Sequence, residues 1–256
     1  MKFLRQWDRD RGRRSPMPDL GKLRDFVAGG HVDAAVFELR PDYRAMLLAA
    51  DGLVPGASDE ASDALLEQAE AVARDALRDL AAEELPHVAS WREAYRAFGA
   101  KPQRTRNSLE ALLRRAPSGL PRVNRLTDLY NAVSVLHEIP VGGEDLTRYA
   151  GSPRLVRATG REVFDTVADG VAVIEHPEPG EVAWCDDVGV TCRLWNWRQA
   201  RRTRLTENTT AALFILDALD PMTDEALHAA TDDLVARLTR LGPDVTVACR
   251  LITAAA

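Results

Sequence analysis

The sequence predicts a mixed α/β protein, and three observations support that class. Long segments at 58–85, 122–137 and 223–241 space their apolar residues three and four apart, as an amphipathic helix does. Short apolar runs of β-type residues lie between 154 and 193 and at 244–252. Of the 256 residues, 46% are hydrophobic and 28% are charged, which is ordinary for a chain that can bury a core.

The composition also sets expectations about compartment and cofactors. No apolar run approaches the ~20 residues that cross a bilayer, and Lys2 and Arg5 are not followed by a signal-like apolar stretch. The three cysteines, Cys185, Cys192 and Cys249, form no C-x-x-C pair, and no histidine is spaced to complete a zinc site. An odd, small cysteine count suits a reducing compartment. We therefore expect a soluble, cytoplasmic protein with no metal, no cofactor and no membrane partner.

The charge is unevenly distributed along the chain. The net charge of −6 argues weakly against nucleic-acid binding. Residues 59–84, however, hold nine acidic against two basic side chains, whereas residues 92–125 hold nine basic against two acidic ones. Residues 193–204 add five arginines and no acid. Two readings stay open: solvated faces of opposite sign, or a local basic footprint for phosphate groups.

The N-terminal part is predicted to hold a basic arm, a strand and a long helix. Residues 1–20 contain five arginines and two prolines, so we expect a flexible arm ahead of a single domain at 21–256. The apolar run at 32–39 predicts a strand. A serine or aspartate at 58–59 can cap a helix that runs to about residue 85.

Two short helices are predicted next. The first, at 91–98, ends at Gly99, which is a typical C-terminal cap. The second begins at Asn107, and Glu110 three residues later is close to a capping box. Prolines and a glycine at 117–121 then predict a turn.

The helix predicted at 122–137 carries an unusual polar face. Asn124, Asp128 and Asn131 fall at i, i+4 and i+7, so they share one side of the helix. Solvated helix faces usually favour glutamate and lysine instead. The three residues therefore favour a pocket, with a solvated face as the alternative.

The C-terminal half is predicted to be rich in short strands. The segment 140–145 reads as a loop in which Gly142 and Gly143 permit unusual dihedral angles or close approach of a ligand. Strands are expected at 155–158, 171–174, 182–185 and 190–197, with the last two joined by a turn at 186–189. Helices at 206–219 and 223–241, capped by Thr206 and Thr223, and a strand at 244–252 complete the chain.

The segment 192–198, CRLWNWR, is the most unusual in the chain. On a strand, Arg193, Trp195 and Trp197 would share one face, and Asn196 and Arg198 the other. One reading is a tryptophan pair in the core that arginines cover. The other is a ligand platform, in which aromatic faces stack on bases while arginine and asparagine hold phosphate or base edges.

No catalytic motif stands out from the residues alone. The chain has no G-x-S-x-G, no P-loop, no G-x-G-x-x-G after a strand and no H-E-x-x-H. The five histidines are scattered, and none is paired by sequence with a nucleophile.

Several runs together resemble a known family. They are WREAYRAFGAKPQRTRNSLEALLRR from Trp91, then LPRVNRLTDLYNAVSVLHEIPVGGEDL, EVAWCDD and CRLWNWR. They are similar to the free-standing form of the B3/B4 domain, which also occurs in the β subunit of phenylalanyl-tRNA synthetase. There the domain is an editing module that hydrolyses mischarged tyrosyl-tRNA. The resemblance covers roughly residues 90–220 and implies one domain with helices packed on a predominantly β core.

The family pattern carries over only in part. Its V-D-x-x-N segment is matched by Thr127, Asp128 and Asn131, and an upstream asparagine is matched by Asn124. Its G-Q-P-L-H-A-F-D segment aligns with 138–145, where a proline and Asp145 match.

Two of the family's recognition residues are absent. The editing-site histidine falls on Gly142, and the glutamate that reads the tyrosine hydroxyl aligns near Phe214 or Ile215. An apolar wall cannot form a hydrogen bond with a hydroxyl group, so the resemblance implies an amino acid smaller or less polar than tyrosine. A shift of the alignment would make Glu207 the reader instead.

The resemblance and the residue patterns together suggest a set of site residues. Asn124, Asn131 and Asn196 are expected to orient water or substrate. The expected substrate-binding residues are Asp128, Gly142, Gly143, Asp145, Arg193, Trp195, Arg198, Thr206 and Thr209, with the two arginines on a phosphate or carbonyl. The expected RNA contacts are Arg104, Arg106, Arg114 and Arg115.

The expected function is binding of the aminoacyl end of a tRNA, with hydrolysis of mischarged aminoacyl-tRNA in trans. Ester hydrolysis needs a positioned water and a stabilised oxyanion, and does not require a protein nucleophile. The first alternative is a binding module without catalysis, for tRNA, an amino acid or a nucleotide. A small-molecule enzyme on the same scaffold is the second, because a fold does not fix a function.

Overall fold

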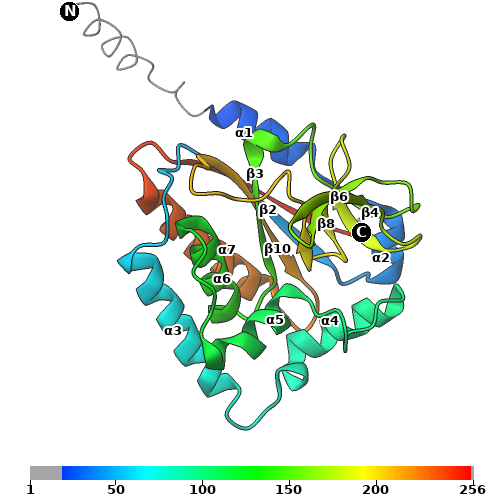
Figure 1. Cartoon of the computed structure of the whole chain (residues 1–256), viewed down its shortest axis with the longest axis horizontal. Helices are drawn as coiled ribbons and strands as arrows, with labels where there is room; N and C mark the ends of the chain where they lie inside the picture. Colours follow the sequence, from blue (N-terminus) through cyan, green and yellow to red (C-terminus); the bar gives the residue numbers. More distant parts are fainter. Residues whose placement is uncertain (1–18, 255–256) are drawn as a thin grey trace, which may run out of the picture.

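A computed structural model describes residues 19–254, and its centre is a four-stranded antiparallel sheet (Figure 1). The strands in spatial order are β11 (Thr246–Thr253), β2 (Arg44–Asp51), β10 (Ala211–Ala218) and β3 (Val141–Asp145). All of the predicted arm except residues 19–20 lies outside the described residues. Among the residues that are described, no helix is long and apolar enough to cross a membrane.

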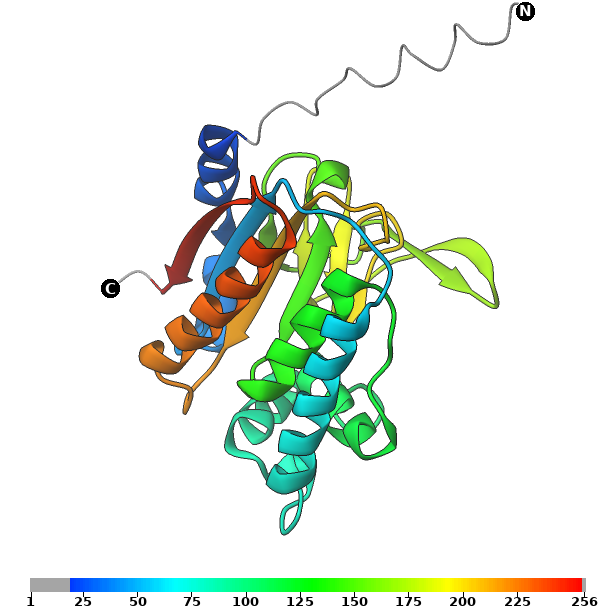
Figure 2. The same ribbon diagram turned by 90° about the vertical axis from the view of Figure 1, so that its left-hand side faces the viewer.

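Helices cover one face of this sheet (Figure 2). They are α6 (Arg125–Leu136) and α7 (Asp224–Leu238), with α3 (Glu60–Ala76) packed on α6. Leu48 of β2 and Phe214 of β10 are buried against Val133 of α6 and Leu234 of α7. The burial of these large apolar side chains is the main force that holds the helices to the sheet.

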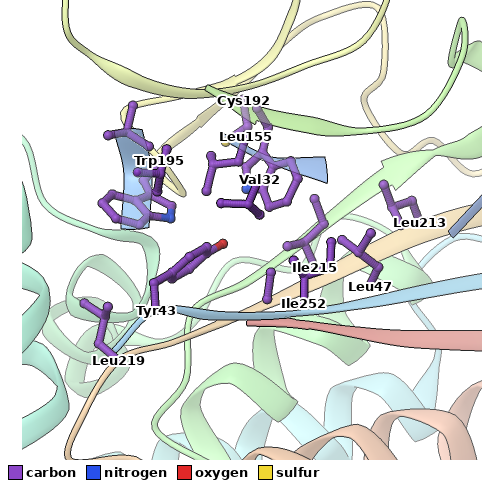
Figure 3. Close-up of a cluster of buried hydrophobic side chains, with 14 of the residues drawn as sticks. Val32, Tyr43, Leu47, Leu155, Cys192, Trp195, Leu213, Ile215, Leu219 and Ile252 are labelled. Atoms are coloured by element: carbon purple, nitrogen blue, oxygen red, sulfur yellow. The ribbon is translucent and has the colours of Figure 1, made fainter. Parts of the chain in front are cut away.

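A second, five-stranded sheet covers the opposite face. Its order is β1 (His31–Val32), β4 (Arg154–Arg157), β7 (Val182–Cys185), β8 (Val190–Arg193) and β9 (Arg198–Gln199). Between the two sheets lies an aromatic-rich core in which Leu47, Leu213 and Ile215 meet Trp195 and Tyr43 (Figure 3). The predicted class, helices on a mainly β core, is confirmed.

The remaining elements lie around these layers. Helices α1 (Leu20–Ala28), α2 (Ala34–Leu39), α4 (Pro86–Ala97) and α5 (Ser108–Arg115) flank the sheets. The hairpin of β5 (Phe164–Ala168) and β6 (Val171–Glu175) projects away from the body (Figure 2). Single-turn helices occur at η1 (Ala82–Glu84), η2 (Ala116–Ser118), η3 (Leu146–Arg148) and η4 (Thr239–Leu241).

The predicted helix starts at Asp59, Asn107 and Thr223 are confirmed. Each of these side chains accepts a hydrogen bond from a backbone N–H three residues later, at 2.9, 2.8 and 3.2 Å. These bonds satisfy N–H groups that the first turn of a helix leaves without partners.

Two N-terminal predictions were wrong. Residues 34–39 form the helix α2 instead of a strand, because Asp33 precedes it and two alanines, which favour helix, fill its first turn. Helix α3 ends at Ala76, well before residue 85. Pro86 occupies the first turn of α4, where its missing N–H costs nothing.

Three further predictions were wrong in the C-terminal half. Residues 141–145, expected to be a loop, form β3, and residues 211–218, expected to be helical, form β10. Every side chain of β10 is buried, and a short run that is apolar except for Asp217 has no periodicity to separate strand from helix. The strand expected to reach Trp197 stops at Arg193, because Leu194 and Trp195 adopt positive φ angles of 51° and 67°.

Candidate functional site

A cavity of about 270 Å³ opens between the two sheets, beside α5 and α6. The central sheet contributes Val141, Gly142, Glu144, Ile215 and Asp217, and the second sheet with its turn contributes Trp184, Cys192, Trp195, Asn196, Trp197 and Gln199. The helices contribute Ser108, Ala111, Leu112, Arg115, Tyr130 and Asn131. Its volume lies just below the range of drug-sized sites, which suits a group as small as one amino acid.

The space in this cavity depends on Gly142. Gly142 pairs with Ile215 in the ladder between β3 and β10. A Cβ atom added to Gly142 would lie 3.7 Å from Nε2 of Gln199, an ordinary contact, so this position has room for a small side chain. Gly143 is different, because its added Cβ would lie 2.8 Å from the Tyr130 ring. Gly143 therefore allows close packing of β3 on α6, and it does not line the cavity.

The left-handed turn after β8 builds one wall of the cavity. Because Leu194 and Trp195 both have positive φ angles, Trp195, Asn196 and Trp197 line the cavity as consecutive residues instead of alternating. Trp195 packs edge-on to Tyr43, with ring centroids 4.9 Å apart, and is fully buried. Trp197 is 40% exposed and lies toward the opening. The predicted alternation of faces through Trp197 was therefore wrong.

Asp217 is the centre of a buried hydrogen-bond network. The Tyr43 hydroxyl donates to Oδ1 of Asp217 at 2.6 Å, and Nδ2 of Asn196 donates to Oδ2 at 3.3 Å. The Tyr95 hydroxyl donates to Oδ1 of Asn196 at 3.0 Å. Burial raises the pKa of Asp217 to about 7, and hydrogen bonds from Tyr43, Asn196 and Trp184 oppose that rise.

Glu144 is a second buried carboxyl group in the cavity. It is 2% exposed, and the Tyr149 hydroxyl donates to its Oε2. Burial raises the pKa of Glu144 to about 7, although the hydrogen bond from Tyr149 lowers it. Glu144 pairs with Leu213, four residues before Asp217 on β10, so the two Cα positions lie roughly 13 Å apart along the strands. The carboxyl groups thus occupy separate parts of the cavity.

Of the three residues predicted to share a polar helix face, only Asn131 lines the cavity. Asn124 caps α6, because its Oδ1 accepts from the Thr127 N–H at 3.0 Å. The carboxylate of Asp128 accepts from Ser58, Ser62 and the N–H of Val123. These two side chains hold α6 against the chain before it. Of the three residues, only Asn131 therefore belongs to the proposed site.

Asp145, Thr206 and Thr209 form a network outside the cavity. The Thr209 hydroxyl donates to Oδ2 of Asp145 at 2.9 Å and accepts from the Thr206 N–H at 3.0 Å. Thr206 does not cap a helix, since the residues after it lead into β10. This network fixes the connection between β3 and β10, and none of its members lines the cavity.

Arg193 and Arg198, expected to bind phosphate or carbonyl groups, have partners within the protein. Arg193 pairs with Glu181 at 2.7 Å and with Glu175 at 3.0 Å. Arg198 pairs with Glu175 at 2.9 Å, and both guanidinium groups lie over the Phe164 ring. Because these contacts tie the turn after β8 to the β5–β6 hairpin, we leave both arginines out of the proposed site.

The four arginines expected to contact RNA fall into two pairs. Arg106 and Arg114 surround the buried carboxylate of Glu110, at 3.6 and 3.0 Å. Arg104 and Arg115 are exposed, and neither forms an ion pair with another residue of the range 19–254. Arg115 also lines the cavity, so it places a positive charge at the opening.

Sequence reasoning missed the two carboxyl groups. Ile215 lines the cavity while Phe214 faces the helices, as alternate residues of β10 must. Asp217 shares the face of Ile215, so this wall holds a carboxyl group beside the expected apolar residue. Glu207 is exposed and lies outside the cavity. An acidic residue inside the apolar run ALFILDAL was the one available signal for Asp217.

Comparison with known proteins shows which family this chain resembles. A B3/4 domain model matches residues 90–244. A solved N-terminal fragment of the phenylalanyl-tRNA synthetase β subunit from Pyrococcus horikoshii is similar, with 12% identity and a TM-score of 0.42, over 85% of this chain and 49% of that one. The chain thus spans about half the length of that fragment, and no curated protein matches it. Because the family model covers more than half of its residues, the chain belongs to the B3/4 domain family.

Proposed function

We propose that the cavity holds the aminoacyl group at the end of a tRNA and that the protein hydrolyses the ester of a mischarged one. The observation that carries this proposal is a cavity sized for one amino acid, inside the segment that matches the B3/4 family. The resemblance of that segment to the editing module described above supports the same substrate class. The cavity is too small to hold a nucleotide and its amino acid together, so the tRNA itself stays outside.

The proposed chemistry is attack of water on the ester carbonyl. A bond forms between the water oxygen and the carbonyl carbon, the ester C–O bond breaks, and the ribose hydroxyl leaves with a proton. The side chain of Asn131 makes no hydrogen bond with another described residue, so its amide can donate to the carbonyl oxygen as charge develops there. Asn196 has one N–H left after its bond to Asp217, and that group can orient the water.

The surface around the opening suits a tRNA end. Arg115 lies at the cavity and Arg104 is exposed on the preceding loop. Near them, the guanidinium groups of Arg92, Arg106 and Arg114 outnumber the carboxylates of Glu110 and Glu83 that pair with them. This local excess of positive charge would attract phosphates despite the net charge of −6.

A binding module without hydrolysis is the second candidate. Gly142 stands where the editing pattern has its histidine, and this favours binding alone. The same cavity would then recognise the aminoacyl group and leave the ester intact.

A deacylation screen tests both candidates. Purified protein is added to correctly and wrongly charged tRNAs, and release of the amino acid is followed with time. We expect at least one wrongly charged tRNA to be hydrolysed faster than its spontaneous rate. Asn131→Ala should slow that reaction at least tenfold, since removal of one oxyanion donor costs about 10²–10³ in rate. Asn208→Ala, at an exposed position outside the cavity, is the matched control.

The screen also separates the two candidates. Saturable binding of charged over uncharged tRNA without hydrolysis would support the binding module. Failure to bind or to hydrolyse any charged tRNA would overturn both.

A further inference from the structure

The charged groups inside the cavity are of one sign. Among the described residues that line it, Glu144 and Asp217 are the buried charged side chains, whereas Arg115 is exposed at the opening. Arg202, which lowers the pKa of Glu144, is paired with Asp186 and does not line the cavity. Burying a carboxylate without an opposite charge of its own is costly. Glu144 receives a hydrogen bond from Tyr149, and a carboxylate can accept about four in total. Glu144 therefore has acceptor capacity left for a ligand.

The walls of the cavity favour a cation as well. Four aromatic side chains line it: Tyr130, Trp184, Trp195 and Trp197. The faces of such rings carry partial negative charge and attract ammonium and guanidinium groups. The Trp184 indole is 1% exposed, and a hydrogen bond from its side chain lowers the pKa of Asp217.

The way an aminoacyl group enters decides which part of it reaches these residues. The ester is attached to a tRNA that stays outside, so its carbonyl lies toward the opening, near Arg115 and the half-exposed Trp197. The side chain then extends toward the buried carboxyl groups. Gly142, on β3 between these two positions, has no side chain of its own to fill the cavity.

We propose that the cavity selects aminoacyl groups whose side chain ends in an ammonium or guanidinium group, with Glu144 as its direct partner. Asp217, which already accepts from Tyr43 and Asn196, adds a second negative charge to the cavity. The inference rests on the proposed function and names the class of amino acid. It replaces the expectation of a smaller or less polar one.

Calorimetric titration with two amino-acid amides tests this selection. L-lysinamide and L-norleucinamide share the four-carbon side chain and the α-ammonium group, and differ in the ε-ammonium group of lysine. We expect the wild-type protein to bind lysinamide at least tenfold more tightly. Glu144→Gln should bring the two affinities within threefold of each other. Glu207→Gln, which neutralises an exposed carboxylate outside the cavity, should keep the wild-type ratio.

The outcomes also separate this inference from the proposed function. Equal affinity of the wild-type protein for the two amides would overturn the inference, since the α-ammonium group would then be what is recognised. Hydrolysis of aminoacyl-tRNAs whose amino acid has a neutral side chain, as fast as of those with a cationic side chain, would also overturn the inference. It would leave the proposed function standing. A tenfold preference for lysinamide in a protein that binds no tRNA would support the inference and remove the proposed function. Wild-type titration decides the point even if Glu144→Gln does not fold.

Discussion

Two buried carboxyl groups, on Glu144 and Asp217, weaken the fold that contains them. Burial raises the pKa of each to about 7, well above the ordinary values of 4.5 and 3.8. At these two positions the folded protein thus keeps protons that the unfolded chain has already released, so their contribution to stability falls as the pH rises from about 4 to about 7. Groups that reduce stability at neutral pH are more readily explained by a role in the cavity than by a structural one.

Replacement of Glu144 by glutamine should therefore stabilise the protein at high pH. The amide can still accept from Tyr149, and it carries no charge to desolvate. We expect the free energy of unfolding at pH 8 to rise by about 1–3 kcal/mol, and the difference to disappear below about pH 4. Urea denaturation at the two pH values measures this.

The groups that face Glu144 define the control for this experiment. Tyr149, Asp186 and Arg202 influence its pKa, and they are unchanged in Glu144→Gln. Glu207→Gln removes an exposed carboxylate and should leave stability nearly constant at both pH values. A Glu144→Gln protein less stable than wild type at pH 8 would show that the carboxylate has a stabilising partner.

At the scale of elements, the edge strand β3 controls whether the cavity is open. Its two glycines point to opposite faces of the sheet, as successive strand residues do. Gly142 faces the cavity, and Gly143 faces Tyr130 of α6. Adjacent glycines thus have different requirements, one for ligand space and one for packing.

Three substitutions on β3 separate these requirements. Gly142→Leu should fill the cavity and abolish ligand binding while the protein folds. Gly142→Ala should bind as wild type does, because its Cβ has an ordinary contact at 3.7 Å. Gly143→Ala should lower the free energy of unfolding by about 1–3 kcal/mol, since its Cβ would lie 2.8 Å from the Tyr130 ring.

Lysinamide titration and thermal unfolding measure these three effects. A Gly142→Leu protein that binds lysinamide as tightly as wild type would exclude this cavity as the site.

The elements also differ in how far local sequence foretold them. The helices at α3, α5 and α7 start at side chains that cap them, and such caps are local signals. Strands β3 and β10 were misread, because partners distant in the sequence supply their hydrogen bonds. β10, for example, lies between β2 and β3. The positive φ angles of Leu194 and Trp195 could not be predicted, because positive φ angles are usually found at glycine and neither residue is one.

At the scale of the whole molecule, opposite charges are concentrated in different segments. The acidic segment 59–84 holds α3, whereas the exposed arginines near the cavity belong to 92–125. Binding of a tRNA through Arg104 and Arg115 would release counterions from its phosphates. Affinity should therefore fall steeply with salt in spite of the overall negative charge.

Filter-binding titrations at several salt concentrations measure this dependence. Arg104→Ala and Arg115→Ala should each weaken tRNA binding and reduce the slope of log affinity against log salt by about one. Arg78→Ala is the matched control, since Arg78 is exposed beyond α3 and pairs with Asp75. An affinity that does not change with salt, or equal effects of all three substitutions, would contradict a tRNA surface at this opening.

The sequence by itself determined the α/β class, the capped helices and the family, because each depends on residues close together in the chain. It also indicated Asn131, Asn196, Gly142, Trp195 and Arg115, which the structure brings to one cavity.

Only the tertiary structure separated these five from Asn124, Asp128 and the paired arginines, whose side chains bind neighbouring residues. Only the tertiary structure placed Glu144 of β3 and Asp217 of β10 in the same cavity. Strand pairing and burial raise the pKa values of both, and these arise from contacts between distant segments.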